Sequence, residues 1–457
     1  MTAHLSPHAP IAMPDAKPNT HAKPAEPMLI TGGRVIDPAT GTDSVADLAI
    51  ENGRIVEIGK SLCRSPAARI IDAKGCIVAP GLVDPHVHLR EPGHEYKESI
   101  RTGSHAAVAG GFTTVCCMPN TAPALDTPEL IRFVLERADG AHCRVFPVAA
   151  ATKGRKGEEL TEIQLLHRAG AVAFSDDGDC IPTAGMMRRV LAAVKQTNRC
   201  FMQHCQDPTL TKGSTMHAGE VSTRLGLVGW PREAEEIIVE RDIRLNRAIK
   251  ARYHVQHISS GETVDMIRRA RADGLPVTGE ASPHHLLLTH SACEGYNTLA
   301  KVNPPLREQR DIDLLRAGVA DGTITILATD HAPHSEDEKQ LGFDDAPMGM
   351  IGLETALALY AEALVHTRLI DWPRLIALLT IEPARLVNLD GQGIGSLKVG
   401  NPADVTILNP ETTWTIRAAD MVSRSKNTPF EGRSARGRVI ATIVGGRVAF
   451  QQASLHT

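Results

Sequence analysis

The feature that most constrains the fold is an alternation of strand-like and helix-like segments through the middle of the chain, from about residue 80 to residue 388. Short runs of apolar and β-branched residues recur there, with helical stretches between them. One helix is expected to open at Asp126-Thr-Pro-Glu, because a capping residue, a proline and an acid stand where a first helical turn favours them. The expected strands begin at Leu82, Thr113, Arg144, Ala171, Cys200, Tyr253, Pro276 and Thr323. About eight βα units in succession predict an α/β fold, a closed (β/α)8 barrel of the TIM type.

Both ends of the chain have a different texture. Short alternating runs begin at Met28, Asp47 and Arg54 near the N-terminus, and at Asp404 and Gly437 near the C-terminus. Such runs, separated by glycine-containing turns, are typical of short antiparallel strands. We therefore expect a small β-sandwich domain formed from both termini, with residues 28–80 as its N-terminal part and residues 391–457 as its C-terminal part. Residues 81–390 would form the barrel, and the Pro-, Ala- and His-rich residues 1–27 a disordered leader.

Composition narrows the class of protein. The 457 residues suit a barrel plus a smaller domain, and a hydrophobic share of 42% beside 22% charged residues is typical of a soluble globular protein. A net charge of −4 and 3% aromatic residues argue against a nucleic-acid partner. No apolar stretch reaches the roughly 20 residues that a membrane helix needs. The nine cysteines form no C-x-x-C pair, so we expect reduced thiols in a cytoplasmic protein.

Residues that can bind a metal ion follow several of the expected strands. In the first strand the two histidines are two positions apart, so strand alternation points both to one face. The candidates are His86 and His88 at the end of the first strand, Asp176 and Asp177 after the fourth, His204 after the fifth, His257 after the sixth and Asp330 after the eighth.

Each candidate alone has an ordinary structural explanation. A lone histidine is more often a hydrogen-bonded core residue than a ligand, and an aspartate after a strand commonly forms a turn or caps the next helix. Their convergence on the rim where barrel enzymes carry their chemistry favours a functional interpretation. Imidazole and carboxylate ligands without thiolate suit a catalytic Zn²⁺ site with an open position. Only one of Asp176 and Asp177 can face inward, and alternation does not decide which.

With these residues in hand, the chain resembles the amidohydrolase superfamily and, within it, the longer bacterial dihydroorotases of type I. The resemblance runs over nearly the whole chain from about Met28. His-x-Arg-Glu-Pro-Gly and Met-Pro-Asn-Thr are specific to that family. The stretches that carry it are Pro80–Gly93, Gly110-Gly-Phe-Thr-Thr-Val, Met118-Pro-Asn-Thr121, Ser282–Leu288, Asn303-Pro-Pro-Leu-Arg307 and Ala328–His334.

The resemblance implies a reaction and a set of roles. The reaction is the reversible opening of the cyclic amide of dihydroorotate to N-carbamoyl-aspartate, a step of pyrimidine biosynthesis, with one or two Zn²⁺ ions. Asp330 would be the catalytic base, and Asp177 would stand where related cyclic amidases use a carboxylated lysine. The metal ligands implied are His86, His88, Asp177, His204, His257 and Asp330. The substrate contacts implied are His88, Arg90, Asn120, Asn303, His334, Met348 and Gly349.

The sequence leaves alternative functions open, and it departs from the family pattern at one position near the ligands. The nearest alternative is another cyclic amidase, of the hydantoinase or allantoinase type, and a second is a non-catalytic scaffold for aspartate transcarbamoylase. A zinc-stabilised structural protein fits poorly with an open rim of His and Asp. The family resemblance also implies association with that transcarbamoylase and a homo-oligomer. After His204 this chain has Gln206 where the family often has Glu, a change outside the ligand set from which we expect little effect on the chemistry.

Overall fold

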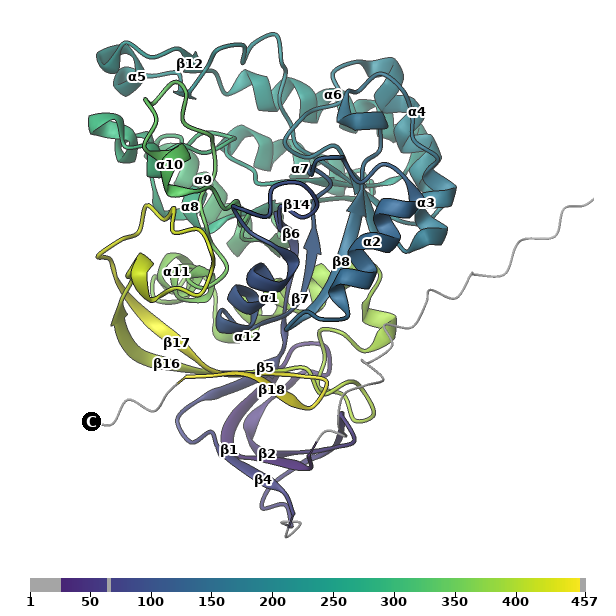
Figure 1. Cartoon of the computed structure of the whole chain (residues 1–457), viewed down its shortest axis with the longest axis vertical. Helices are drawn as coiled ribbons and strands as arrows, with labels where there is room; N and C mark the ends of the chain where they lie inside the picture. The colour runs from purple at the N-terminus through teal and green to yellow at the C-terminus, as the bar shows by residue number, and fades with distance from the viewer. Residues whose placement is uncertain (1–25, 64–66, 453–457) are drawn as a thin grey trace, which may run out of the picture.

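The computed structural model describes residues 26–63 and 67–452. The predicted leader, residues 1–27, lies outside the described residues except for its last two. The chain forms two parts, a barrel surrounded by helices and a β-sheet that lies beneath it in the view of Figure 1.

Eight parallel strands form the barrel, in the order in which they follow one another along the chain. The first and last strands approach each other through a parallel bridge between Val87 and His331, which brings the sheet close to full closure. Such strands are covered on both faces, and Phe112–Cys117 is accordingly buried at every position. The predicted barrel is confirmed. Its strands are β6 (Leu82–Val87), β7 (Phe112–Cys117), β8 (Arg144–Ala149), β9 (Ala173–Ser175), β10 (Cys200–Gln203), β13 (Arg252–Val255), β14 (Val277–Ala281) and β15 (Ile326–Leu327).

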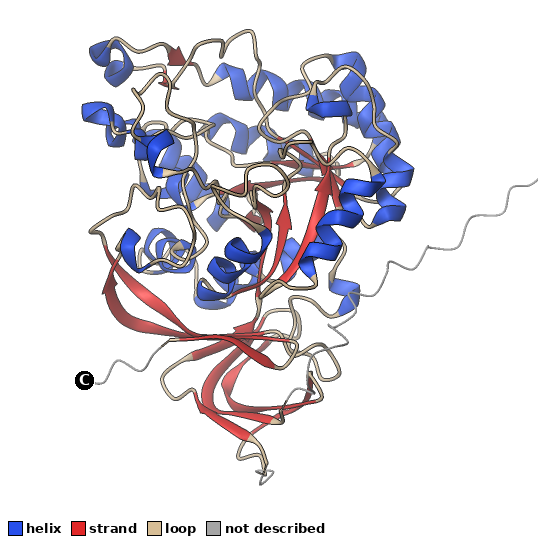
Figure 2. Cartoon of the chain, viewed as in Figure 1, coloured by secondary structure: helices blue, strands red, loops and turns tan. Residues whose placement is uncertain are grey.

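Helices surround these strands (Figure 2). The second helix begins as the sequence predicts, because the side chain of Thr127 accepts a hydrogen bond from the Leu130 amide and Pro128 occupies the first turn. The helices of the barrel are α1 (Ile100–Ala109), α2 (Pro128–Ala138), α3 (Ile163–Ala169), α4 (Ala184–Lys195), α6 (Glu233–Ile249), α7 (Gly261–Ala272), α9 (Gln309–Ala320), α11 (Ala356–Tyr360), α12 (Trp372–Leu379) and α13 (Ile381–Leu386). Shorter elements between them are β11 (Met216–His217), α5 (Glu220–Leu225), β12 (Gly229–Trp230), α8 (Pro283–Leu287) and α10 (Glu336–Lys339).

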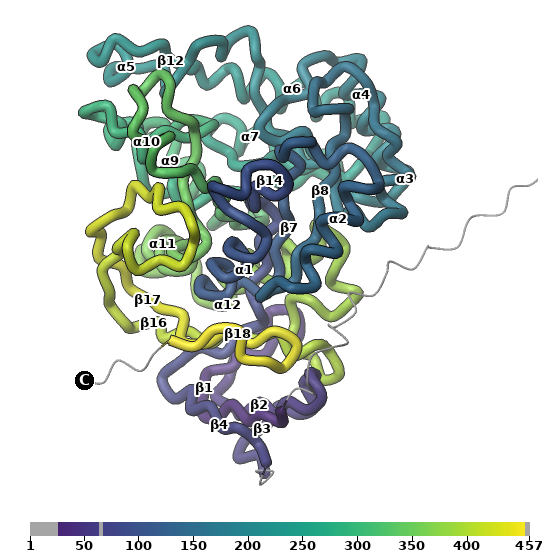
Figure 3. The backbone as a smooth tube through the Cα atoms, in the orientation of Figure 1, coloured from purple at the N-terminus to yellow at the C-terminus, as the bar shows by residue number. Residues whose placement is uncertain are grey.

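The second part is made from both ends of the chain, as predicted, and its eight strands are hydrogen-bonded into one sheet. Its strands are β1 (Met28–Asp37), β2 (Thr42–Glu51), β3 (Arg54–Gly59), β4 (Arg69–Asp72), β5 (Ile77–Pro80), β16 (Val405–Thr415), β17 (Ser434–Val444) and β18 (Arg447–Gln451). N-terminal β5 pairs with C-terminal β16, so the purple and yellow ends of the tube lie side by side in Figure 3. Most pairs are antiparallel, as expected, but β1 pairs in parallel with β4 and β5.

The sheet and the barrel meet where the chain passes from one to the other. Pro80 ends β5 in the sheet and Leu82 begins β6 in the barrel, so a single residue, Gly81, separates the two parts. None of the nine cysteines, all of which are described, forms a disulfide. Among the described residues, no helix combines the length and apolar character needed to cross a membrane.

Candidate metal centre and substrate pocket

The six predicted metal ligands come together at one end of the barrel. His86 and His88 lie at the end of β6, and the other four follow the ends of β9, β10, β13 and β15. All six are buried, with at most 5% of each residue exposed. Because the carboxyl ends of the strands in a parallel barrel meet on one rim, residues far apart in the sequence become neighbours here.

The two adjacent aspartates after β9 point in different directions. The Asp176 carboxylate accepts hydrogen bonds from the Ala151 amide (2.8 Å) and the Thr152 amide (3.0 Å), which fasten the loop after β8. Asp177 faces the histidines instead. Strand alternation alone does not decide which of the two aspartates faces the histidines. In the structure it is Asp177, because Asp176 is bound by the backbone amides of Ala151 and Thr152.

One oxygen of Asp177 is the point on which the ligands converge. Its Oδ1 lies 3.3 Å from His86 Nε2, 3.6 Å from His204 Nδ1 and 3.6 Å from His257 Nε2. Despite these neighbours, Oδ1 is buried and has no hydrogen-bond partner among the described residues. A buried carboxylate oxygen without a partner is costly unless something else binds it. Several ligand atoms arranged around such an oxygen fit a divalent cation.

A second group of ligand atoms overlaps the first. His88 Nε2 is 3.1 Å from Asp330 Oδ1 and 3.4 Å from Asp177 Oδ2, and His86 Nε2 is 3.6 Å from Asp330 Oδ1. The two groups that could hold an ion are His86, Asp177 and His257, and His86, His88 and Asp330. These groups share His86, so their ligand atoms form one continuous cluster.

The backbone is strained at three residues of the site. Arg90, His257 and Asp330 have positive φ angles of 61°, 27° and 48°. Residues other than glycine rarely adopt this region, which costs about 1–3 kcal/mol each and is found mainly at functional sites. The fold therefore holds these three residues in a strained backbone conformation, in which their side chains lie at the rim.

The electrostatics of the cluster favour ionised carboxylates. Burial alone would raise the pKa of Asp330, but the hydrogen bond from His88 and the charges of His86 and His257 lower it below its usual range. The pKa of Asp177 is likewise lowered against the effect of burial, chiefly by His86. Both carboxylates are therefore ionised near neutral pH, which is the form in which a carboxylate binds a metal ion.

Glu280 lies within the site, although no sequence motif singles it out. Its Oε1 accepts from His86 Nδ1 at 2.6 Å and from the His257 amide at 3.1 Å, and its Oε2 pairs with His254 at 2.9 Å. These neighbours lower its pKa to about 2 although burial opposes ionisation. A carboxylate on Nδ1 fixes the tautomer of His86 and leaves Nε2 to face the metal position. The sequence signal that could have identified Glu280 is its position near the end of the seventh barrel strand.

Gln206 also makes contacts at the site. It lies outside the ligand set, but its Oε1 accepts from His204 Nε2 (2.9 Å) and from Asn303 Nδ2 (3.1 Å). Its Nε2 donates to Thr211 Oγ1 at 2.8 Å. Gln206 therefore connects a predicted metal ligand to a predicted substrate contact.

Four of the predicted substrate contacts form one continuous group beside the metal position. Arg90 Nε donates to the Pro333 carbonyl (3.2 Å), and Arg90 Nη2 lies 3.3 Å from His334 Nε2. His334 Nε2 donates to the Met348 carbonyl at 2.9 Å. At Gly349, whose φ is +138°, a Cβ would come within 2.8 Å of the Ala332 Cβ and 3.1 Å of the His334 ring, so only glycine fits.

The charges in this group suit an anionic ligand. Burial lowers the pKa of Arg90 to about 10, which leaves the guanidinium charged at neutral pH. Burial, reinforced by Arg90 and Lys97, lowers the pKa of His334, so this imidazole is neutral. A buried guanidinium needs a negative partner, and a carboxylate matches its planar fork.

Two asparagines and His88 complete the set of predicted contacts. Asn120 Oδ1 accepts from His88 Nδ1 at 2.8 Å, and no described residue accepts from its amide nitrogen. Asn303 Oδ1 is buried and has no partner in the part of the chain that the structure describes, while its nitrogen donates to Gln206. Each asparagine thus keeps one unused polar group beside the metal position, Asn120 a donor and Asn303 an acceptor.

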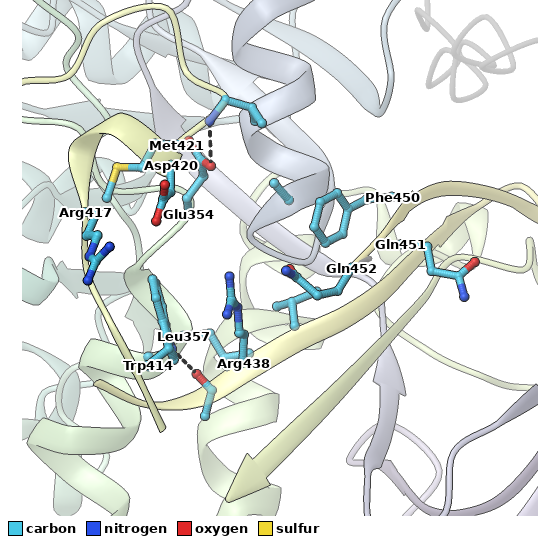
Figure 4. A pocket seen from close by; sticks show the side chains of 15 residues that line it. Glu354, Leu357, Trp414, Arg417, Asp420, Met421, Arg438, Phe450, Gln451 and Gln452 are labelled. Atoms are coloured by element: carbon cyan, nitrogen blue, oxygen red, sulfur yellow. Dashed lines mark hydrogen bonds between the residues drawn. The ribbon is translucent and has the colours of Figure 1, made fainter. Parts of the chain in front are cut away.

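A separate cavity lies away from this rim, between α1, α11 and the strands β16 to β18 (Figure 4). Its volume is about 200 Å³, and Glu354, Trp414 and Arg438 are among the residues that line it. It contains none of the predicted metal ligands or substrate contacts, so it is not the candidate active site.

Comparison with known proteins agrees with this geometry. The sequence model of a family described as "Dihydro-orotase-like" matches residues 75–263. The chain is 45% identical to a dihydroorotase of Pelotomaculum thermopropionicum over 424 residues, which cover 93% of this chain and 98% of that protein. It is 47% identical to a dihydroorotase of Syntrophotalea carbinolica over 425 residues, 93% of this chain and 99% of the relative.

Solved structures resemble the fold. The L-hydantoinase (dihydropyrimidinase) of Arthrobacter aurescens superposes with a TM-score of 0.83 at 25% identity, covering 94% of this chain and 97% of that one. A dihydropyrimidinase from Brevibacillus agri gives a TM-score of 0.82 at 24% identity, over 92% of this chain and 94% of the other.

The barrel, its rim of histidines and aspartates and these likenesses define the class: this is a cyclic amide hydrolase of the amidohydrolase type. Within that class the relatives that match almost end to end are dihydroorotases. The chain belongs to the dihydroorotase family.

Proposed function

We propose that this chain catalyses the reversible, zinc-dependent hydrolysis of dihydroorotate to N-carbamoyl-aspartate, a step of pyrimidine biosynthesis. The observation that carries the proposal is the pairing of two features on one rim. The ligand cluster around Asp177 lies beside a buried, charged Arg90, which fits a ring amide that carries a carboxylate. Six-membered cyclic amides that lack the carboxylate would offer Arg90 no anionic group to bind.

The donor set fits zinc, with His86, His88, Asp177, His204, His257 and Asp330 as the proposed ligands of one or two ions. When bound there, zinc would supply polarisation of the ring carbonyl and a lowered pKa of the attacking water. The absence of lysine at 177 means that the bridging role proposed for Asp177 needs no carboxylated side chain.

Asp330 is the proposed general base. Its carboxylate is ionised, is held by His88 and reaches into the ligand cluster from the end of the eighth strand. It would take the proton from the attacking water and deliver it to the ring nitrogen as the amide bond breaks. In the ring-closing direction Asp330 would take that proton from the nitrogen as it attacks the side-chain carboxyl group, and would pass it to the carboxyl oxygen that leaves as water.

The other proposed contacts hold the substrate in place. Arg90, Asn120 and His334 would bind the carboxylate, with Arg90 providing the charge and the asparagine amide a neutral donor. Asn303 Oδ1 and the backbone at Met348 and Gly349 would bind polar groups of the ring. Together these contacts would orient the ring amide toward Asp330 and would weaken the binding of rings that lack the carboxylate.

Replacing Arg90 with alanine should raise the KM for dihydroorotate about 10- to 100-fold, since a hydrogen bond to a charged group contributes ~1.5–3 kcal/mol. Arg90→Lys should recover only part of the loss, because lysine keeps the charge without the planar fork. Steady-state kinetics on both variants check this, with Arg132→Ala on the exposed face of α2 as the matched control. An unchanged KM in Arg90→Ala would place Arg90 outside the substrate site.

The substrate is tested by comparing ring opening of dihydroorotate with that of hydantoin, allantoin and dihydrouracil, which has the same ring without the carboxylate. The proposal predicts rapid turnover of dihydroorotate alone. Faster turnover of hydantoin or allantoin would be compatible with the fold and the metal centre but would show that dihydroorotate is not the substrate. No turnover of any ring by the zinc-loaded protein would favour the scaffold for aspartate transcarbamoylase.

A homo-oligomer, association with aspartate transcarbamoylase and a cytoplasmic location stay predictions that rest on the family. Size-exclusion chromatography of the protein, alone and mixed with the transcarbamoylase, tests the first two.

A further inference from the structure

A stretch of the C-terminal part leaves the small sheet and packs on the active-site rim. Between β16 and β17 the chain rises beside α11, where it is drawn in yellow in Figure 3. We call residues 421–430 the C-terminal strap. The expectation for residues 391–457 placed this whole stretch in the β domain.

We propose that the strap, through Asn427, positions the loops that hold the substrate carboxylate. Asn427 is a positioning residue in this account, because it acts through Arg90 and His334. The inference rests on the proposed function for the identity of the substrate, but the contacts that carry it are independent of any ligand.

Asn427 connects two loops that are not adjacent in sequence. Its Nδ2 donates to the Ala332 carbonyl and to the Gly349 carbonyl, both at 3.1 Å, and its Oδ1 accepts from the His334 amide at 3.1 Å. Its own carbonyl accepts from the Ile351 amide at 3.0 Å. With 3% of its surface exposed, the residue uses every polar group of its side chain in this contact.

The loop that Asn427 holds also fixes Arg90. Arg90 Nε donates to the Pro333 carbonyl, which lies between the two residues of this loop that Asn427 binds, Ala332 and His334. A shift of this loop would therefore move the guanidinium and the His334 imidazole together. Misplacing binding groups by about 1 Å can cost about a hundredfold in rate.

The strap holds a third loop, the one that follows Arg90. Ser425 Oγ donates to the Lys97 carbonyl at 2.7 Å, and Ser423 Oγ donates to Glu98 Oε2 at 2.6 Å. Arg424 donates to the Glu95 carbonyl. The strap thus contacts three loops beside the proposed carboxylate site.

The strap itself is anchored at its start and end. The amides of Val422 and Ser423 donate to the Glu354 carboxylate at 2.9 and 3.0 Å. Phe430 is buried in an apolar cluster with Ile351 and Leu359. These contacts suit a fixed support better than a moving lid.

No other side chain reproduces the contacts of Asn427. Alanine removes all three side-chain bonds and leaves buried groups without partners. Aspartate keeps an acceptor for the His334 amide but turns a second oxygen toward the carbonyl oxygens of Ala332 and Gly349, where a donor is needed. Both Asn427→Ala and Asn427→Asp should therefore loosen the two loops.

The test measures KM, kcat and zinc content of the purified full-length protein for Asn427→Ala and Asn427→Asp. We expect KM for dihydroorotate to rise about 10- to 100-fold, with zinc content unchanged and a smaller effect on kcat. Asn409→Ala is the matched control, because Asn409 also binds backbone amides in the C-terminal part but lies on β16. A variant with wild-type KM at equal zinc content would overturn the inference.

Amide hydrogen exchange gives a second readout that needs no turnover. In Asn427→Asp, peptides that cover residues 331–335 and 348–352 should exchange faster, while a peptide that covers β6 should not change. Unchanged exchange in both loops would overturn the inference. A wild-type protein that does not open dihydroorotate would remove the proposed function instead, and the exchange comparison would still decide whether Asn427 orders these loops.

Discussion

Replacing Asp330 with asparagine should lower the turnover of dihydroorotate by about 10²- to 10⁴-fold, the range that a positioned general acid–base contributes. Asparagine has nearly the same size and can keep the contact with His88, but it cannot accept a proton near neutral pH. The fold should survive, because the carboxylate of Asp330 contacts the histidine cluster rather than the structural core. The measurement is kcat at saturating dihydroorotate, with zinc content and circular dichroism recorded on the same sample.

Asp337→Asn is the matched control for this experiment. Asp337 lies seven residues further along the chain on α10, with an exposed side chain. Its replacement should leave kcat unchanged. Near-normal turnover in Asp330→Asn would remove Asp330 as the base and move the search for a proton acceptor to the other carboxylates of the rim.

Asp177→Asn should weaken zinc binding more than about 100-fold, and turnover should fall with it. Changing a residue that only supports a metal ligand typically costs 10–100-fold in affinity, and losing a ligand on which three histidines converge should cost more. The expected cause is the loss of one negative charge from a buried group of imidazoles. Competition with a chelator of known zinc affinity measures the change directly.

The neighbouring residue provides an informative comparison. Asp176 binds the amides of Ala151 and Thr152 and has no contact with the histidines. Asp176→Asn should keep zinc affinity near that of the wild type, because the asparagine oxygen can still accept from both backbone amides and its nitrogen can donate to the Thr152 hydroxyl. If Asp176→Asn lost zinc and Asp177→Asn kept it, the orientation of this pair would be wrong.

The barrel could be predicted from the sequence because its signal is local and repeated. Each strand is a short apolar run, and the chain order of the strands is also their order in the sheet. The rim could be predicted for a related reason, since a residue that follows a barrel strand must lie at the same end as its counterparts. His204 and His257 are separated by 53 residues, yet their ring nitrogens approach to 2.7 Å.

Other features depend on contacts that no local pattern encodes. Alternation shows that one of Asp176 and Asp177 faces inward, but the choice depends on backbone donors from the loop after β8. The role of Glu280 depends on His86 and His254, which belong to two other strands. The parallel pairing of β1 with β4 and β5 could not be read from turns, because turns indicate only the antiparallel neighbours.

The contacts of the strap could not be predicted from the sequence for a physical reason of the same kind. Asn427 stands in a stretch without strand or helix periodicity, and its partners lie 78 to 95 residues away. In the sequence, Gln206 stands out only as a departure from the family pattern. Its contacts with His204 and Asn303 become visible once β10 and the loop that carries Asn303 are placed together.

The central claim is that the histidine and aspartate cluster is a metal centre on which dihydroorotate hydrolysis depends. The most direct test is to remove metal from the purified protein with a chelator and then titrate zinc back while following both bound metal and turnover. The account predicts that the metal-free protein is inactive, and that turnover rises in proportion to zinc until one or two ions are bound per chain. Full turnover by protein shown to contain no metal would contradict it.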